Sequence, residues 1–268
     1  MTHQPHELVI QAFLLDGEGG GSQVDWDAVR QWNGDSAPLW AHFNASNDDL
    51  QTWLREESGL DEAACDVLLA EETRPRSVQL SGGLCVILRG INLNPGAEPE
   101  DMVSLRLWVD SKRMFSLSRR RLLAIDELAR ALKTQTGPTD SAGLLNGLTE
   151  LLLENMAPAL EELSESVDLL EDRSLTEAPS ALQGELAELR HQVISMRRHL
   201  APQREAMSRL IHNTSSFFDD QDRADEQFLV DQITRYVEEL DELRDRTGVI
   251  HDLLSGRQAE AMNRQTLV

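Results

Sequence analysis

Apolar side chains recur every three or four residues over the last part of the chain, residues 223–268. This alternating spacing is typical of a coiled-coil-like helix. At 1.5 Å per residue such a helix would extend about 60 Å, against roughly 35 Å across a compact domain of this size. We therefore predict a projecting stalk helix whose apolar seam is buried by other copies of the chain. The predicted oligomer seam consists of Leu229, Ile233, Tyr236, Leu240, Leu243, Ile250 and Leu254.

Two more long helices are predicted immediately before the stalk, in residues 141–212. Apolar residues again recur at helical spacing, from Leu145 to Leu170 and from Leu182 to Leu210. A break at residues 177–179, which includes Pro179, separates the two runs, because proline is poorly tolerated inside a helix. We expect a helical hairpin, joined to the stalk by the polar segment 213–222.

Residues 1–140 hold all five tryptophans and alternate between strand-like and helix-like runs. Leu105, Leu107 and Val109 alternate with polar residues, which is typical of a half-exposed strand. Asn47 precedes a helix-like run and is a suitable N-cap. The predicted fold is α+β: a mixed sheet covered by helices in residues 1–140, then the helical hairpin, then the projecting stalk.

The charge balance favours cations as ligands. The 268 residues include 47 acidic and 25 basic side chains, which gives a formal net charge of −22. Nucleic acid is an unsuitable partner, because phosphate binding needs a basic surface. The chain shows no secretory signal and no apolar run long enough to cross a bilayer, so we expect these residues to be soluble. Cys65 and Cys85 lack a metal-type spacing and are expected in the core.

A second stripe runs along the stalk helix beside the seam, acidic at first and then small and neutral. Its members recur at steps of three, four or seven residues and share one face. Around a common axis, such stripes would form rings of carboxylates that concentrate cations; a merely solvated helix face is the alternative. The predicted pore-lining stripe consists of Glu238, Asp241, Asp245, Asp252, Ser255, Ala259, Asn263 and Thr266.

Three segments, in this order along the chain, carry a resemblance to a known family: RSVQLSGGLCVILRG, LRLWVDSKRMFSLSRRRL and HDLLSGRQAEAMNRQTLV. With the acidic sheet domain, the hairpin and the long helix, they resemble the CorA-type divalent cation transporters, and most of all the zinc transporters among them. In that family the long helix continues into the first of two transmembrane helices, and a Gly-x-Asn signature follows. Neither the transmembrane helices nor the signature occurs in these residues.

The resemblance implies a homopentameric cytoplasmic funnel at the inner membrane, whose stalk helices surround an ion path. It puts Asp252, Ser255, Ala259, Asn263 and Thr266 on the pore side. Divalent cations, zinc or magnesium, would be transported or regulatory ions, and no other cofactor is implied. Membrane contact would come only through a segment after Val268. The competing hypothesis is a soluble coiled-coil adaptor that dimerises through the stalk helix.

Other candidate sites are weaker. The histidines, among them His191 and His199, lack the spacing to chelate one ion, so metal ligands stay unassigned. The acidic hairpin face from Glu161 to Asp172 suits either weak divalent-ion binding or simple solvation. The basic cluster at residues 119–121 could bind an anion, pair with carboxylates or mark a strand-to-helix junction. No hydrolase, P-loop, dinucleotide or metalloprotease motif is present, so we expect a non-enzyme.

Overall fold

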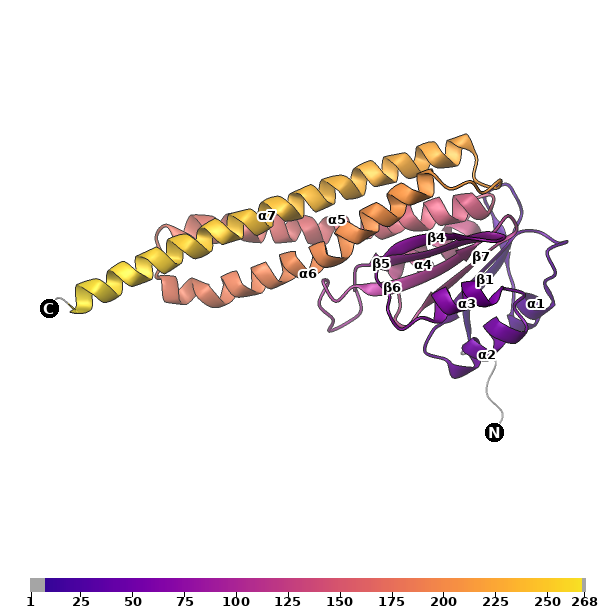
Figure 1. Ribbon diagram of the computed structural model, residues 1–268, viewed down its shortest axis with the longest axis horizontal. Coiled ribbons are helices and arrows are strands. Elements are labelled where there is room, and N and C mark those ends of the chain that lie inside the picture. The colour runs from indigo at the N-terminus through magenta and orange to yellow at the C-terminus, as the bar shows by residue number, and fades with distance from the viewer. Residues whose placement is uncertain (1–7, 267–268) are drawn as a thin grey trace.

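The computed structural model describes residues 8–266. The described residues form a seven-stranded mixed sheet with the order β2-β1-β3-β7-β6-β5-β4, which lies at one end of the elongated molecule (Figure 1). Only the central β3–β7 pair is parallel among these strands. The strands are β1 (Val9–Leu15), β2 (Gly21–Gln23), β3 (Leu39–Asn44), β4 (Arg76–Leu80), β5 (Gly83–Gly90), β6 (Val103–Val109) and β7 (Arg113–Ser118). The predicted α+β fold with a mixed sheet is confirmed.

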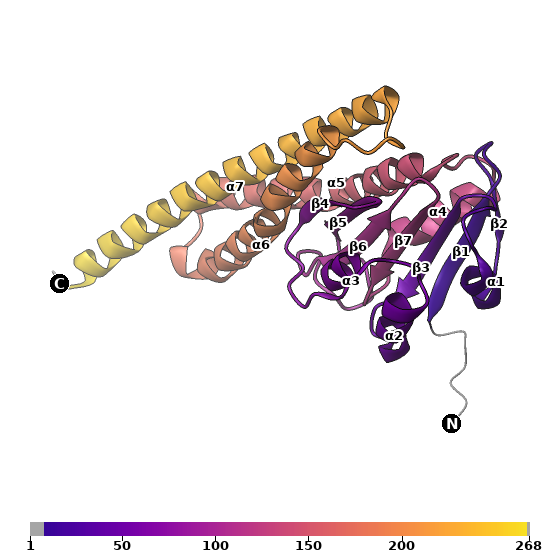
Figure 2. The ribbon, with the colours of Figure 1, turned by 45° about the vertical axis from the view of Figure 1, so that its right-hand side comes forward.

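Helices cover both faces of the sheet (Figure 2). One face packs against α1 (Trp26–Gln31), α2 (Asp48–Glu56) and α3 (Glu62–Leu69), and the other against α4 (Leu123–Lys133) and α5 (Ser141–Ser174). The strands supply both cores by alternation, because successive side chains point to opposite faces. In β5, for example, Leu84 and Val86 belong to the α5 side and Cys85 to the α3 side.

Three long helices extend together from one end of the sheet as an arm (Figure 1). After α5, the chain turns at residues 175–178 into α6 (Pro179–Ile211), and α7 (Asp220–Thr266) then runs along both. At 1.5 Å per residue, the 47 residues of α7 span about 70 Å. None of the described helices is apolar over a length that could cross a membrane.

The apolar seam of α7 is buried within a single chain, which contradicts its assignment to an intersubunit contact. Leu240, Leu243 and Leu254 are each about 1 % exposed or less, and they pack in one core with residues of α5 and α6. The prediction treated the domain as a sphere from which one helix projects. In the structure the hairpin projects with the stalk and covers its apolar face.

The remaining seam residues follow the same pattern. Leu229, Ile233 and Ile250 are buried, and the half-buried Tyr236 donates a hydrogen bond from its hydroxyl to the Leu153 carbonyl of α5, at 3.2 Å. Every residue of the predicted oligomer seam therefore contacts the chain's own hairpin core. The seam therefore needs no second copy of the chain to cover it, and an assembly would form through other surfaces.

Helix α7 begins three residues earlier than residue 223, the predicted start of the stalk. Asp219 and Asp222 form a reciprocal cap, in which each carboxylate accepts the backbone N–H of the other residue at 2.8 Å. This arrangement satisfies N–H groups that the first turn of a helix leaves without partners. The polar composition of residues 213–222 suggested a linker, but its last residues serve as the cap and first turn.

Candidate cation-facing surface

The face of α7 opposite the hairpin is exposed to solvent along most of the helix. Glu238, Asp245 and Asp252 lie on this outer face, as the predicted pore-lining stripe requires. Glu242 and Val249 lie between them and are also exposed, although the predicted stripe omitted both. The centre of the exposed face thus follows steps of three and four residues from 238 to 252. This outer face of α7, residues 238–252, is the candidate cation-facing surface.

Asp241 departs from the predicted stripe. Its carboxylate accepts hydrogen bonds from the guanidinium of Arg197 on α6, and Arg244 lies 3.1 Å from it. The Arg197 guanidinium holds the pKa of the Asp241 carboxyl below its ordinary value. Asp241 therefore turns toward α6 and helps to attach α7 to the hairpin, unlike the other acidic residues of the predicted stripe.

The far end of α7 carries the neutral part of the stripe. Ser255, Ala259 and Asn263 are exposed, in keeping with the predicted stripe, and Thr266 is helical but its side chain lies outside the described residues. Leu254 is the last residue of α7 buried in the hairpin core. Beyond it, the Arg257 guanidinium donates to the Ser174 carbonyl at the end of α5.

Only one of the three carboxylates Glu238, Asp245 and Asp252 forms an ion pair within the described residues. Asp245 pairs with Arg244 at 2.8 Å. Within residues 8–266, Glu238 and Asp252 have no ion-pair partner. The described residues also contain no cluster of three or more His, Cys, Asp or Glu side chains suited to a metal ion. Within one chain, the outer face is thus a row of separate carboxylates and not a chelating centre.

A buried carboxyl on α7 was missed by the sequence analysis. Glu226 is fully buried, and neither of its carboxyl oxygens has a hydrogen-bond partner among the described residues. Burial raises the pKa of Glu226 from its ordinary value of 4.5 to about 8. The sequence spacing could have predicted this burial. Glu226 lies three residues before Leu229 and seven before Ile233, and therefore on the same helix face as the apolar seam.

The other candidates fall into two groups. Cys65 and Cys85 are free and buried in the core, as expected. His191 and His199, placed two turns apart on α6, line one cavity beside the sheet. Burial, with the nearby Arg89 and Arg198, lowers the pKa of the half-buried His199 to about 4, so that its ring is neutral at pH 7.

The chain combines a mixed sheet with a three-helix arm whose long last helix exposes an acidic face. The family model described as CorA-like Mg²⁺ transporter protein matches residues 35–268. The chain therefore belongs to the CorA-like family, as the resemblance in three of its segments predicted.

Two relatives illustrate the match in sequence. The divalent cation transporter CmaX of Pseudomonas aeruginosa is 38 % identical over 263 residues, which cover 96 % of this chain and 78 % of that protein. The zinc transport protein ZntB of Pectobacterium carotovorum is 34 % identical over 262 residues, which cover 97 % of this chain and 79 % of that protein.

Solved structures agree with this assignment. Full-length CmaX superposes with a TM-score of 0.91 at 36 % identity, over 99 % of this chain and 82 % of that one. The ZntB cytoplasmic domain from Vibrio parahaemolyticus gives a TM-score of 0.83 at 25 % identity, over 94 % of this chain and 99 % of that one. The CorA magnesium transporter of Methanocaldococcus jannaschii, 14 % identical with a TM-score of 0.79, shares the fold.

Proposed function

We propose that this chain forms the cytoplasmic domain of a divalent cation transporter at the inner membrane, with zinc as the transported ion. Family membership supports the transport class, and the relatives named as zinc transport proteins support the ion. The observation that carries the proposal is the row of carboxylates on α7, which points away from the helices of its own chain. A cation path lined by this row would need the outer faces of several chains.

The assembly is proposed as a homopentamer with α7 nearest the axis. In this proposal, residues 1–140 are assigned to the sheet domain, residues 141–212 to the hairpin and residues 223–268 to a stalk that would lead toward a transmembrane segment. Since α5 and α6 occupy the seam, the outer face of α7 is the side left for the axis. Rings of Glu238, Asp245 and Asp252 would then concentrate cations by their summed charge.

The coiled-coil adaptor is the weaker candidate. It requires the seam of α7 to pair with a second copy, but Leu240 and Ile250 already pack inside their own chain. The family match gives it no support either.

An enzyme is also a weaker candidate. The sequence contains no motif of a catalytic site, and the family is one of transporters.

Zinc binding to the acidic row tests the proposal directly. Like charges brought together around an axis raise each other's pKa, and a bound divalent cation relieves this repulsion. Zinc should therefore raise the Tm of the assembled chain by several degrees, through mass action on the folded state. The triple variant Glu238→Gln/Asp245→Asn/Asp252→Asn should lose most of this gain, as measured by differential scanning fluorimetry with and without ZnCl₂.

The hairpin offers a matched control. Glu161, Glu165 and Asp172 are exposed on α5, so that Glu161→Gln/Glu165→Gln/Asp172→Asn removes the same charge from a different face. This control variant should keep the zinc-dependent gain. An equal loss of the Tm gain in both variants would show that the gain depends only on the total charge of the chain. An undiminished Tm gain in the α7 variant would show that the acidic row does not bind zinc, and would contradict the proposal.

A further inference from the structure

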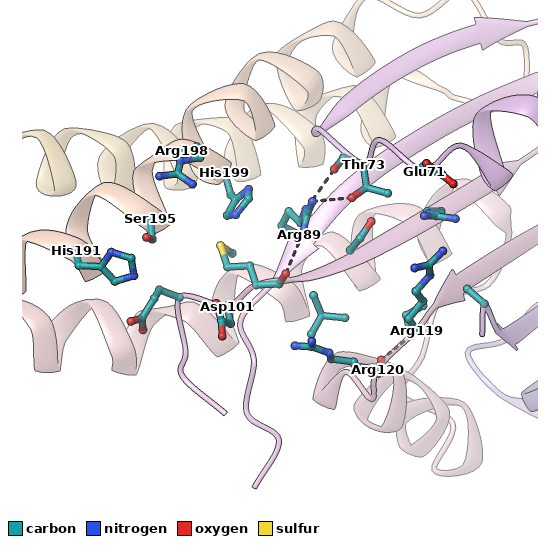
Figure 3. Close-up of a pocket in the computed structure, with 17 residues that line it drawn as sticks. Glu71, Thr73, Arg89, Asp101, Arg119, Arg120, His191, Ser195, Arg198 and His199 are labelled. Carbon is teal, nitrogen blue, oxygen red and sulfur yellow. Dashed lines mark hydrogen bonds between the residues drawn. The ribbon is translucent and has the colours of Figure 1, made fainter. Parts of the chain in front are cut away.

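A cavity of about 470 Å³ lies where α6 meets the sheet (Figure 3). Its volume is within the range of small-molecule sites, roughly 300–1,000 Å³. The lining comes from the ends of several strands, the loop after α3 and one side of α6. It holds an unusual excess of positive charge for a chain of net charge −22. The basic residues that line it are Arg89, Arg106, Arg119, Arg120, Arg198, His191 and His199.

The sheet itself brings two of these arginines together. In the antiparallel β5–β6 pair, Arg89 lies opposite Ser104 and Arg106 lies opposite Ile87, so both arginines project from the same face. Arg106 is only 6 % exposed. Burial lowers the pKa of both guanidinium groups, and the neighbouring Arg119 adds to this effect at Arg106.

The side chains of Arg89 and Arg106 donate hydrogen bonds to neutral groups. Arg89 donates to the Thr73 carbonyl at 3.2 Å, to the Thr73 hydroxyl at 2.6 Å and to the Met102 carbonyl at 3.0 Å (Figure 3). Arg106 donates to the Leu68 carbonyl at 2.8 Å. Among the residues that the structure describes, none of the five lining arginines forms an ion pair.

The acidic side chains of the cavity do not balance this charge. Glu71, Glu100 and Asp101 also line it, which leaves five arginines against three carboxylates. Only Arg89 and Arg106 are withdrawn from solvent, and holding these two positive charges there without paired anions is costly. By contrast, Arg121, which follows directly in the chain, pairs with Asp126 at 2.7 Å. Of the basic cluster at residues 119–121, only Arg119 and Arg120 line the cavity.

We propose that this cavity binds a phosphate group, either inorganic phosphate or the phosphate of a small phosphorylated molecule. Guanidinium groups match the geometry of phosphate oxygens and give charge-assisted hydrogen bonds. Arg119 and Arg120 would approach the anion from the end of β7, and Arg198 and the neutral His199 from α6. A bound anion would therefore contact both the sheet and the helical arm, at a site separate from the acidic row of α7.

The test is calorimetric titration of the assembled wild-type chain in EDTA with inorganic phosphate, pyrophosphate or ATP as separate probes. EDTA removes divalent ions, so the outcome does not depend on cation binding to α7. At least one probe should bind, and adenosine should not. The variant Arg119→Gln/Arg120→Gln should weaken binding about tenfold or more, because it removes two charge-assisted contacts. Both residues are exposed, so the variant should fold.

The control is Arg74→Gln/Arg209→Gln, which removes two exposed arginines from a neighbouring hollow between the sheet and α6. It should leave the affinity unchanged. Equal binding of phosphate and ATP would identify free phosphate as the ligand, and tighter binding of ATP would identify a phosphorylated molecule. Three results would overturn the proposal: no binding of any probe, undiminished binding in Arg119→Gln/Arg120→Gln, or binding only after the assembly dissociates. The last would mean that acidic groups of a neighbouring copy fill the cavity.

Discussion

Replacing Leu240 with alanine should destabilise the chain by about 2–5 kcal/mol, the cost of removing a large buried side chain from a packed core. Leu240 is fully buried between α7 and the hairpin. The loss should appear in chemical denaturation followed by circular dichroism. Because the contact is made within one chain, sedimentation under native conditions should show the same assembly as the wild type.

Val249 provides the matched control on the same helix. It is 68 % exposed on the outer face, so that Val249→Ala should leave the free energy of unfolding almost unchanged. If Leu240→Ala instead dissociated the assembly while each chain kept its stability, the seam would be an intersubunit contact after all.

Replacing Glu226 with glutamine should stabilise the protein at neutral pH. The folded state raises the pKa of Glu226 to about 8, whereas the unfolded chain keeps the ordinary value of 4.5. Stability associated with this carboxyl is fully present below pH 4.5 and is lost as the pH rises through about 8. The free energy of unfolding falls by about 1.4 kcal/mol for each pH unit above 4.5, so that the Glu226 carboxyl destabilises the folded state by about 3 kcal/mol at pH 7.

Glutamine keeps the shape of the side chain and carries no charge to desolvate. The difference in unfolding free energy between Glu226→Gln and the wild type should therefore grow from below about 1 kcal/mol at pH 5 to about 3 kcal/mol at pH 7. Denaturant titrations at a series of pH values measure it. Glu205→Gln, at an exposed position of α6, should show no such trend. A pH-independent difference at Glu226 would mean that its carboxyl is ionised in the folded protein.

The sequence predicts the helical elements well because their signals are local. The apolar spacing of α5, α6 and α7 and the break before Pro179 depend only on neighbours along the chain. The exposure of Glu238, Asp245 and Asp252 follows from the same periodicity, since they lie away from the seam.

The neighbours along the chain do not determine which element packs on an apolar helix face. Periodicity shows that Leu240 faces something apolar, but α5 and α6 could be identified as its cover only from the packed arm. The ion pair of Asp241 could not be predicted for the same reason, because its partner Arg197 lies 44 residues away in sequence. Likewise, Arg89 and Arg106 meet only through the register of β5 and β6.

The central claim, that the outer faces of α7 from several copies surround one axis, can be tested by cross-linking at Asp252. The only native cysteines, Cys65 and Cys85, are buried, so that Asp252→Cys places a single accessible thiol on the outer face. A short thiol-reactive cross-linker should join the copies into a covalent ladder that ends at five chains on a denaturing gel. Glu165→Cys, on the exposed side of α5, should give little cross-linking. A ladder that stops at two chains, or equal cross-linking at both positions, would contradict the account.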